Sequence, residues 1–259
     1  MTTINISEKM WGKKAIHIPN ITDLFGIERV GGFADNYQTR VLCLLAKRHK
    51  LILPERHRQS SLELIKHFND LGFDHFNADQ LIFLNDNGNK TEIAALTLAL
   101  SENIPELTST DYRTLVPFVT THNTNLLATK FNKKLRMNYS MSTLLNDKAH
   151  LRELLIEKGI RVPGAYRVSI YGDDYIQKSI AIYEMLKSQG IKEFAVVIPQ
   201  ACSGFGILRF KNKSQLLKLI SKPDFTEFLI DPWYSDNIGS PSFQVFIRCE
   251  TWRAEREVE

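Results

Sequence analysis

The sequence predicts an α/β protein built from two consecutive units, and three observations lead to this fold class. Up to about residue 139, short apolar runs alternate with amphipathic segments, which is typical of a largely parallel sheet covered by helices on both sides. Beyond it, two helical segments precede two short strands joined by a turn with two glycines. The 259 residues are 43% apolar and 24% charged, a composition that allows a sizeable buried core.

The elements of the first unit follow one another at short intervals. We expect helices over residues 39–47, 60–71, 91–102 and 123–132, strands over 51–54 and 80–84, a turn over 85–89, and a strand end at 117–121. In the helix over 60–71, the spacing of Leu62, Ile65 and Leu71 predicts an inward face, and Gly72 follows its last residue. A polar stretch over residues 136–142 is the expected boundary to the second unit.

The second unit is expected to begin with a helix that Asn146 caps. Leu151, Leu154 and Leu155 fall on one face of this helix, and Gly159 with the following proline ends it. The remaining expected elements are helices over 173–189 and 213–220 and strands over 194–198, 207–210, 228–233 and 240–247. In the helix over 173–189, the residues of the apolar face are Ile176, Ile180, Tyr183 and Leu186.

The turn between the strands over 194–198 and 207–210 contains Gly204 and Gly206. Because glycine has no Cβ, the backbone N–H groups of such a turn can approach an anion closely, as in a phosphate cradle. An ordinary hairpin, in which the two glycines only satisfy turn geometry, is the alternative interpretation. The order of the neighbouring motifs favours the cradle.

Four motifs in this order resemble the nucleotide-binding lobe of the ATP-grasp superfamily, which contains carboxylate–amine and carboxylate–thiol ligases. They are Asp147-Lys148 at the start of a helix, the Gly-Ile-Arg-Val-Pro run over 159–163 at its end, Val196-Val197, and the Ser-Gly-Phe-Gly-Ile run over 203–207. The resemblance covers about residues 140–230. It implies a pre-ATP-grasp α/β domain over 1–139, the N-terminal lobe over 140–227, and the start of a C-terminal lobe, truncated, over 228–259.

The resemblance also implies the residues that bind the nucleotide. Lys148 and the backbone of Ser203, Gly204, Phe205 and Gly206 would hold the phosphates. Asp231 would hold the ribose, although an aspartate at a strand end also caps turns. In the family a lysine stands on the strand before the glycine turn, where this sequence has Ile198.

The loss of that lysine removes one charge-assisted contact, worth about 1.5–3 kcal/mol. Two basic residues on the return strand, Arg209 and Lys211, are candidates to replace it, and strand register decides which faces the cleft.

The implied reaction is the ATP-dependent joining of a small-molecule carboxylate and an amine through an acyl phosphate. ATP and Mg²⁺ are the implied cofactors, but the catalytic residues and the Mg²⁺ ligands are not identifiable in the sequence. The glutamates at the end of the chain, Glu250, Glu255, Glu257 and Glu259, are interpreted as part of a solvated tail or of a cut strand rather than as Mg²⁺ ligands. The chain is therefore expected to be catalytically incomplete by itself. A non-catalytic nucleotide-binding or interaction protein is the alternative.

Composition argues against two other classes of protein. The net charge is +4, and aromatic residues do not interleave with the basic clusters near residues 47–58 and 130–136, so these clusters indicate solvated faces rather than a nucleic-acid partner. No apolar run approaches the eighteen or so residues of a membrane span. Without a secretory signal, a cytoplasmic location is the expectation.

Cysteine and histidine spacing indicates no metal site. Cys43, Cys202 and Cys249 are far apart and are expected to be free thiols. His57 stands between two arginines, which favours a surface position.

Overall fold

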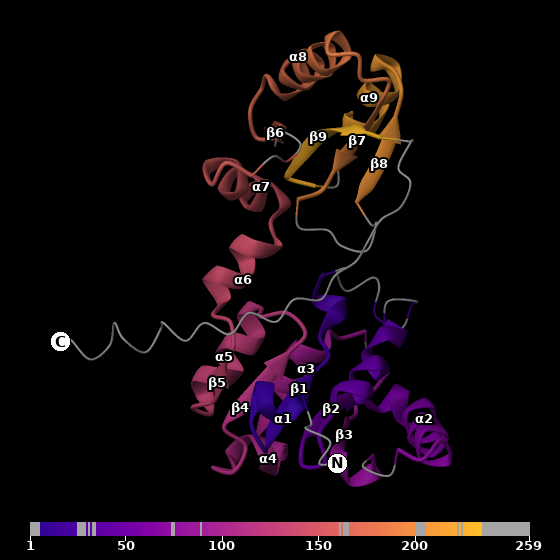
Figure 1. The fold of residues 1–259 in the computed structure, drawn as a ribbon, viewed down its shortest axis with the longest axis vertical. Coiled ribbons are helices and arrows are strands. Elements are labelled where there is room, and N and C mark those ends of the chain that lie inside the picture. The colour runs from indigo at the N-terminus through magenta and orange to yellow at the C-terminus, as the bar shows by residue number, and fades with distance from the viewer. Residues whose placement is uncertain are drawn as a thin grey trace, which may run out of the picture.

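The computed structural model describes residues 6–24, 30, 32, 35–73, 76–88, 90–160, 162, 166–199, 206–221, 223 and 225–234. They form two sheets, a five-stranded sheet of order β3-β2-β1-β4-β5 and a four-stranded sheet of order β6-β9-β7-β8 (Figure 1). Every strand pair of the first sheet is parallel, and every pair of the second is antiparallel. The predicted α/β class, with a small parallel-sheet unit first, is confirmed.

The parallel sheet lies in the first half of the chain. Its strands are β1 (Ala15–Ile18), β2 (Lys50–Pro54), β3 (Leu81–Leu84), β4 (Thr114–Pro117) and β5 (Lys134–Leu135). The α-helices of this half are α1 (Ile6–Trp11), α2 (Arg58–Asp70), α3 (Ile93–Ala99), α4 (Pro105–Thr108) and α5 (His122–Lys130). Its 3₁₀ turns are η1 (Ile21–Leu24), η3 (Asp35–Leu44), η4 (Glu55–His57), η5 (Ala78–Gln80) and η6 (Ser101–Asn103).

Helices cover both faces of the parallel sheet, as expected of an all-parallel sheet. On one face, Ile16, Ile18 and Ile52 pack against residues of α3, α4 and α5. On the other, Leu51 and Leu53 pack against η3 and α2. Both faces of β1 and β2 are therefore buried.

The structure differs in detail from several expectations for the first unit. The helix expected over 39–47 is the 3₁₀ helix η3, which begins earlier, at Asp35, and ends at Leu44. In α2, Ile65 is buried, but Leu62 and Leu71 are 37% and 60% exposed. The strand end expected at 117–121 corresponds to the end of β4 at Pro117, and residues 118–121 follow that strand.

His57 is a further correction, since it is buried rather than at the surface. Its Nε2 lies 3.1 Å from Oδ2 of the buried Asp35, and Arg56 binds the same carboxylate through Nε and Nη2 at 2.6 and 2.9 Å. Burial alone would raise the pKa of Asp35, but the hydrogen bonds from His57 and Arg56 outweigh it and hold that pKa below its usual value. The buried carboxylate of Asp35 thus provides the hydrogen-bond partner that keeps His57 inside the protein.

A buried pair of histidines joins β1 to the segment before β2. Nε2 of His17 and Nδ1 of His49 are 3.0 Å apart, and Nε2 of His49 lies 2.9 Å from the carbonyl oxygen of Gly12. Burial, with a smaller contribution from His49, lowers the pKa of His17 to about 3. Both imidazoles are therefore neutral in the folded protein at neutral pH.

The second half contains α6 (Tyr139–Asn146), α7 (Lys148–Glu157), β6 (Tyr166–Ser169), α8 (Tyr175–Ser188), β7 (Glu193–Val197), β8 (Ile207–Phe210), α9 (Lys213–Ile220) and β9 (Glu227–Trp233). Helix α6 occupies part of the stretch expected to be a polar boundary. Asn146 ends α6, and the N-cap of α7 is Asp147, whose side chain accepts hydrogen bonds from the N–H groups of Ala149 and His150. The prediction of Asn146 as the cap is wrong by one residue.

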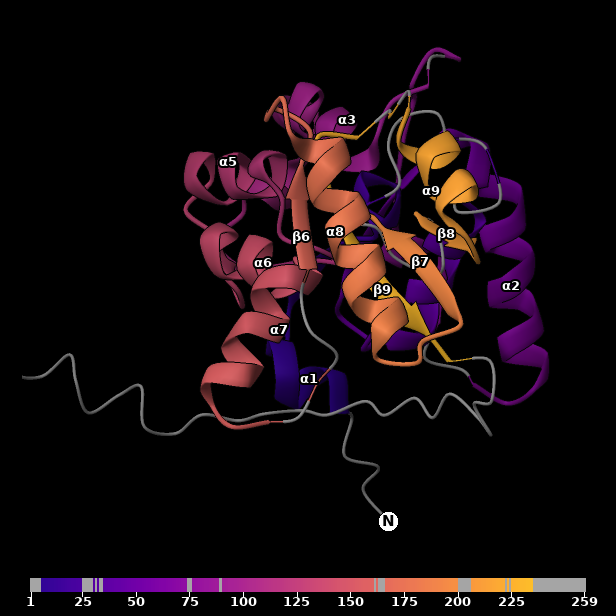
Figure 2. The ribbon, with the colours of Figure 1, turned by 90° about the horizontal axis from the view of Figure 1, so that it is seen from above.

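Helices α8 and α9 cover one face of the antiparallel sheet (Figure 2). Tyr183 and Leu186 of α8 and Leu216 of α9 belong to the same buried cluster as Phe194 and Val196 of β7. In the part of the chain that the structure describes, no helix is long and apolar enough to cross a bilayer. Cys43 is an exposed free thiol, and Cys202 and Cys249 lie outside the described residues.

Candidate functional site

Alternation along β7 assigns its side chains to two different environments. Phe194 and Val196 point into the core beneath α8 and α9. Ala195 and Val197 point to the opposite face, where they contact Leu229 of β9 and Ala149 of α7. The candidate site lies on this second face.

Helix α7 packs on the sheet through its smallest side chain. Ala149 is fully buried, whereas Leu154 is 38% exposed and Leu151 and Leu155 are half-buried. The predicted face of three leucines is therefore not the face that packs on the sheet. The alanine allows the helix backbone to come close to the sheet.

Ion pairs fix the first turn of α7 at the β6 edge of the sheet. Arg167 Nη2 donates to Asp147 Oδ1 at 3.0 Å, and Arg167 Nη1 lies 3.6 Å from Glu227 Oε2. His150 is within 3.3 Å of the same Nη2. These groups line a second cavity of about 430 Å³ between α6, α7 and β6, and we assign them to holding the helix.

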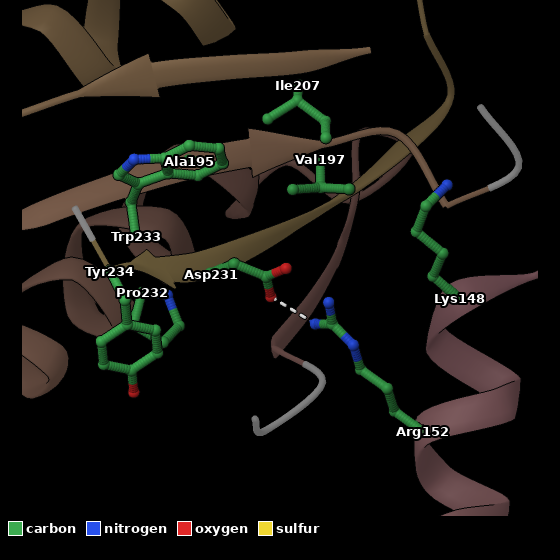
Figure 3. Close-up of a pocket in the computed structure, with 9 residues that line it drawn as sticks. All are labelled: Lys148, Arg152, Ala195, Val197, Ile207, Asp231, Pro232, Trp233 and Tyr234. Carbon is green, nitrogen blue, oxygen red and sulfur yellow. Dashed lines mark hydrogen bonds and ion pairs between the residues drawn. The ribbon is translucent and has the colours of Figure 1, made fainter. Parts of the chain in front are cut away.

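A cavity of about 260 Å³ lies between α7 and the sheet (Figure 3). Lys148 and Arg152 of α7 form one side of it. The other side and the floor are formed by Ala195, Val197, Ile207, Asp231, Pro232, Trp233 and Tyr234. A wall of small apolar side chains, two cations, one carboxylate and two aromatic rings thus converge on one space, the usual make-up of a small-molecule site.

Lys148 lies at the end of β7 where the glycine turn begins. Its Nζ donates to the carbonyl oxygens of Ile198 and Pro199 at 3.5 and 3.2 Å, and its backbone N–H donates to Pro199 at 3.1 Å. The N–H of Ile198 in turn donates to the carbonyl of Gly206 at 2.8 Å. The predicted phosphate-binding lysine therefore lies at the base of the glycine turn.

Of the turn itself, only Gly206 belongs to the described residues. Its φ of +69° is in the left-handed region that favours glycine, which fits the role that turn geometry predicts for it. Ser203, Gly204 and Phe205 lie outside the described residues, as does the strand predicted over 240–247. Their assignment to phosphate binding stays a prediction.

Strand register shows which of the two basic candidates, Arg209 of β8 or Lys211 directly after it, lies on the side of the cavity. Arg209 pairs with Ala195, and its guanidinium carbon lies 5.2 Å from the centroid of the Trp233 ring. Lys211 instead forms an ion pair of 2.7 Å with Glu193. Arg209 therefore reaches the aromatic rim of the cavity, although it is not among the residues that line it.

Side-chain alternation also shows which residue faces the cavity near Ile198, the position where the family has a lysine. Val197, and not Ile198, lines the cavity at the end of β7. The wall that β7 contributes is thus wholly apolar, and the cations of the cavity come from α7.

Asp231 lies inside β9 and is 7% exposed. Its Oδ1 accepts a hydrogen bond of 2.6 Å from Nη1 of Arg152. This position excludes the alternative of a turn cap at a strand end. Arg152 was not predicted from the sequence, although it follows Lys148 by four residues, the spacing that places two side chains on the same face of a helix.

The described residues do not fit a Mg²⁺ site. Mg²⁺ binds through carboxylate and other oxygen ligands, yet Asp231 is the one carboxylate among the residues that line the cavity. No group of three or more potential ligands occurs anywhere in the described part of the chain. The terminal glutamates lie outside that part.

Comparison with solved structures returns matches of low sequence identity. D-alanine–D-alanine ligase from Coxiella burnetii matches with a TM-score of 0.46 and 13% identity, over 85% of this chain and 63% of that one. D-alanyl-alanine synthetase A from Vibrio cholerae matches with 0.44 and 8%, over 85% and 59%. N5-carboxyaminoimidazole synthetase from Staphylococcus aureus, complexed with ADP, matches with 0.45 and 13%, over 86% and 48%.

The three solved structures are those of a ligase and two synthetases. The chain spans between 48% and 63% of their lengths. No family model and no curated protein matches the sequence.

Proposed function

We propose that the cavity beneath α7 binds ATP and that the chain is the nucleotide-binding part of an ATP-dependent carboxylate–amine ligase. One observation carries the proposal: Lys148 of α7 and Asp231 and Trp233 of β9, two parts of the chain that are far apart in the sequence, line one cavity at the base of the glycine turn. The order of motifs from Asp147-Lys148 to the glycine turn supports the same assignment.

Each part of a nucleotide has a matching surface in the cavity. The triphosphate would lie at the Lys148 end, where the N–H groups of the turn at 203–206 add hydrogen-bond donors. The base would lie against Trp233 and Tyr234, since aromatic rings stack on every base. Asp231 would accept a hydrogen bond from a ribose hydroxyl, with Arg209 beside Trp233 at the rim.

In the proposed reaction, a substrate carboxylate oxygen attacks the γ-phosphorus of ATP, which forms an acyl phosphate and releases ADP. The amine then attacks the acyl carbon, the C–N bond forms, and inorganic phosphate leaves. The residues of this chain would bind and orient ATP and neutralise its phosphate charge, which is the main contribution of proteins to phosphoryl transfer. Because the described residues do not fit Mg²⁺, we assign no catalytic step to a metal here.

A second candidate function is nucleotide binding without catalysis. The apolar wall at Val197 and the single carboxylate of the cavity favour it, since both reduce the groups available for phosphoryl transfer. In this version ADP and ATP bind, but neither is turned over.

An ADP-release assay separates the two candidates. ATP is supplied with mixtures of small carboxylates and amines, and ADP is measured by a coupled enzyme. Release that requires both a carboxylate and an amine supports the ligase. Binding of ATP with no dependence of ADP release on either substrate supports the non-catalytic protein, and absence of ATP and ADP binding contradicts both.

A further inference from the structure

We propose that Arg152 is the second phosphate-binding cation of the cavity, and that Asp231 positions its guanidinium for this role. The inference rests on the proposed nucleotide site and adds a residue that the sequence motifs do not assign. It also gives Asp231 a task in addition to its contact with the ribose.

The placement of Arg152 is the first support. Lys148 and Arg152 are one turn apart on α7, and both line the cavity. Figure 3 shows both side chains leaving the helix on the side of the sheet, with the Arg152 guanidinium directed at Asp231.

Charge is the second support. Ala195, Val197 and Ile207 offer no charge on the sheet side, and Lys148 and Arg152 are the only basic residues among those described that line the cavity. Asp231 cancels one of these two positive charges, which leaves a net charge of +1. The cavity therefore attracts an anion. Without Arg152, the charges of Lys148 and Asp231 would cancel and the net charge would be zero.

The geometry of the ion pair is the third support. A guanidinium has five N–H donors in a fixed planar fork. With the described residues, Arg152 makes one hydrogen bond, from Nη1 to Asp231 Oδ1 at 2.6 Å. Its side chain is 21% exposed and that of Asp231 is 9% exposed, so a nearly buried carboxylate holds the fork in place while the other donors stay available for phosphate oxygens.

The test compares a ligand that has phosphates with one that lacks them. Dissociation constants of ADP and adenosine are measured by calorimetry for the wild-type protein, Arg152→Met, Arg152→Lys and Lys158→Met. We expect Arg152→Met to weaken ADP binding about tenfold or more and adenosine binding less than twofold, and Arg152→Lys to recover part of the loss. Lys158, at the opposite end of α7, is the matched control and should leave both constants unchanged.

The positioning role of Asp231 is tested through the ratio of adenosine to ADP dissociation constants. Asp231→Asn should lower this ratio, and it should lower it no further when Arg152 is already methionine, because the two residues act as a unit. The double variant also removes the unpaired carboxylate that Arg152→Met leaves, so it keeps the test valid if the single variant folds poorly. Thermal unfolding of each variant checks the fold.

The outcomes separate this inference from the function on which it rests. If wild-type protein binds ADP and Arg152→Met leaves the ratio unchanged, the inference is overturned and the nucleotide site stands. If Asp231→Asn changes binding of ADP but not of 2′-deoxy-ADP, Asp231 contacts the ribose and does not position Arg152. If wild-type protein binds neither ADP nor ATP, both proposals are overturned.

Discussion

Lys148 and Pro199 are joined twice, since both the backbone N–H and Nζ of Lys148 donate to the carbonyl oxygen of Pro199, at 3.1 and 3.2 Å. The backbone bond holds the start of α7 on the end of β7 whatever side chain stands at position 148. A substitution of the side chain therefore leaves this backbone link between α7 and β7 in place. The fold depends on the backbone of Lys148, whereas the proposed nucleotide binding depends on its side chain. A substitution of Lys148 therefore tests the proposed binding most directly.

The contact of α7 with the sheet should not tolerate a larger side chain at Ala149. Ala149 is fully buried against Ala195, Val197 and Leu229, so Ala149→Leu has to displace the helix. We expect a loss of about 1–3 kcal/mol of unfolding free energy, together with weaker nucleotide binding. Urea unfolding measures the first effect. Ala181→Leu, on an exposed position of α8, is the control, and an equal loss in both variants would contradict the close packing.

The buried His17 should make the protein less stable in acid. Its pKa falls from 6.5 to about 3 on folding, mainly through burial, so the unfolded chain binds a proton that the folded protein does not. The stabilisation present above pH 6.5 is lost as the pH falls toward 3, by about 2 kcal/mol between pH 7 and pH 5.

Urea unfolding of wild-type protein and His17→Gln at these two pH values checks the effect of His17. The variant should lose about 2 kcal/mol less than the wild type over this interval. His67→Gln removes an imidazole from an exposed position of α2 and controls for the loss of a histidine. Equal pH dependence of the wild type and His17→Gln would contradict the buried neutral histidine.

Asp23 should have the opposite effect. Burial, partly offset by hydrogen bonds from Asn20 and Thr121 and reinforced by Glu92, raises its pKa from 3.8 to about 6, and its Oδ1 is buried with no hydrogen-bond partner among the described residues. A group whose pKa is raised on folding favours the folded state below the unfolded pKa, and that contribution is lost as the pH rises through 6.

Between pH 5 and pH 8, the ionisation of Asp23 should cost about 1.5 kcal/mol. Asp23→Asn removes this cost, so its stability should fall less over this interval than that of the wild type. Chemical unfolding at the two pH values gives the comparison, with Asp70→Asn at an exposed position of α2 as the control. A variant as pH-sensitive as the wild type would rule out a raised pKa at Asp23.

The parts of the fold that are determined by residues close together in the sequence could be predicted. The hairpin of β7 and β8 follows from an apolar run and a glycine turn, and its predicted bounds differ from the observed ones by one residue at β7. The central strand β1 could not be predicted in this way. It has four residues with a histidine among them, and its pairing with β2 and β4 joins distant parts of the chain.

The candidate site, like the fold, could be predicted from the sequence only in part. Lys148 and Asp231 follow from the motif resemblance, and the structure brings both to one cavity. Arg152 could not be predicted because its place in the site depends on its hydrogen bond to Asp231, which lies 79 residues away in the sequence. His57 was misplaced for the same reason, since the carboxylate of Asp35 that buries it is not adjacent in sequence.

The most direct test of the central claim is a calorimetric titration of the wild-type protein and Lys148→Met with ADP. We predict that the wild type binds and that the variant binds about tenfold to a hundredfold more weakly, which corresponds to one lost charge-assisted contact. Its unfolding free energy should change by no more than about 1 kcal/mol, because the backbone bond to Pro199 remains. Equal affinity of the two proteins, or no binding by the wild type, would contradict a nucleotide site beneath α7.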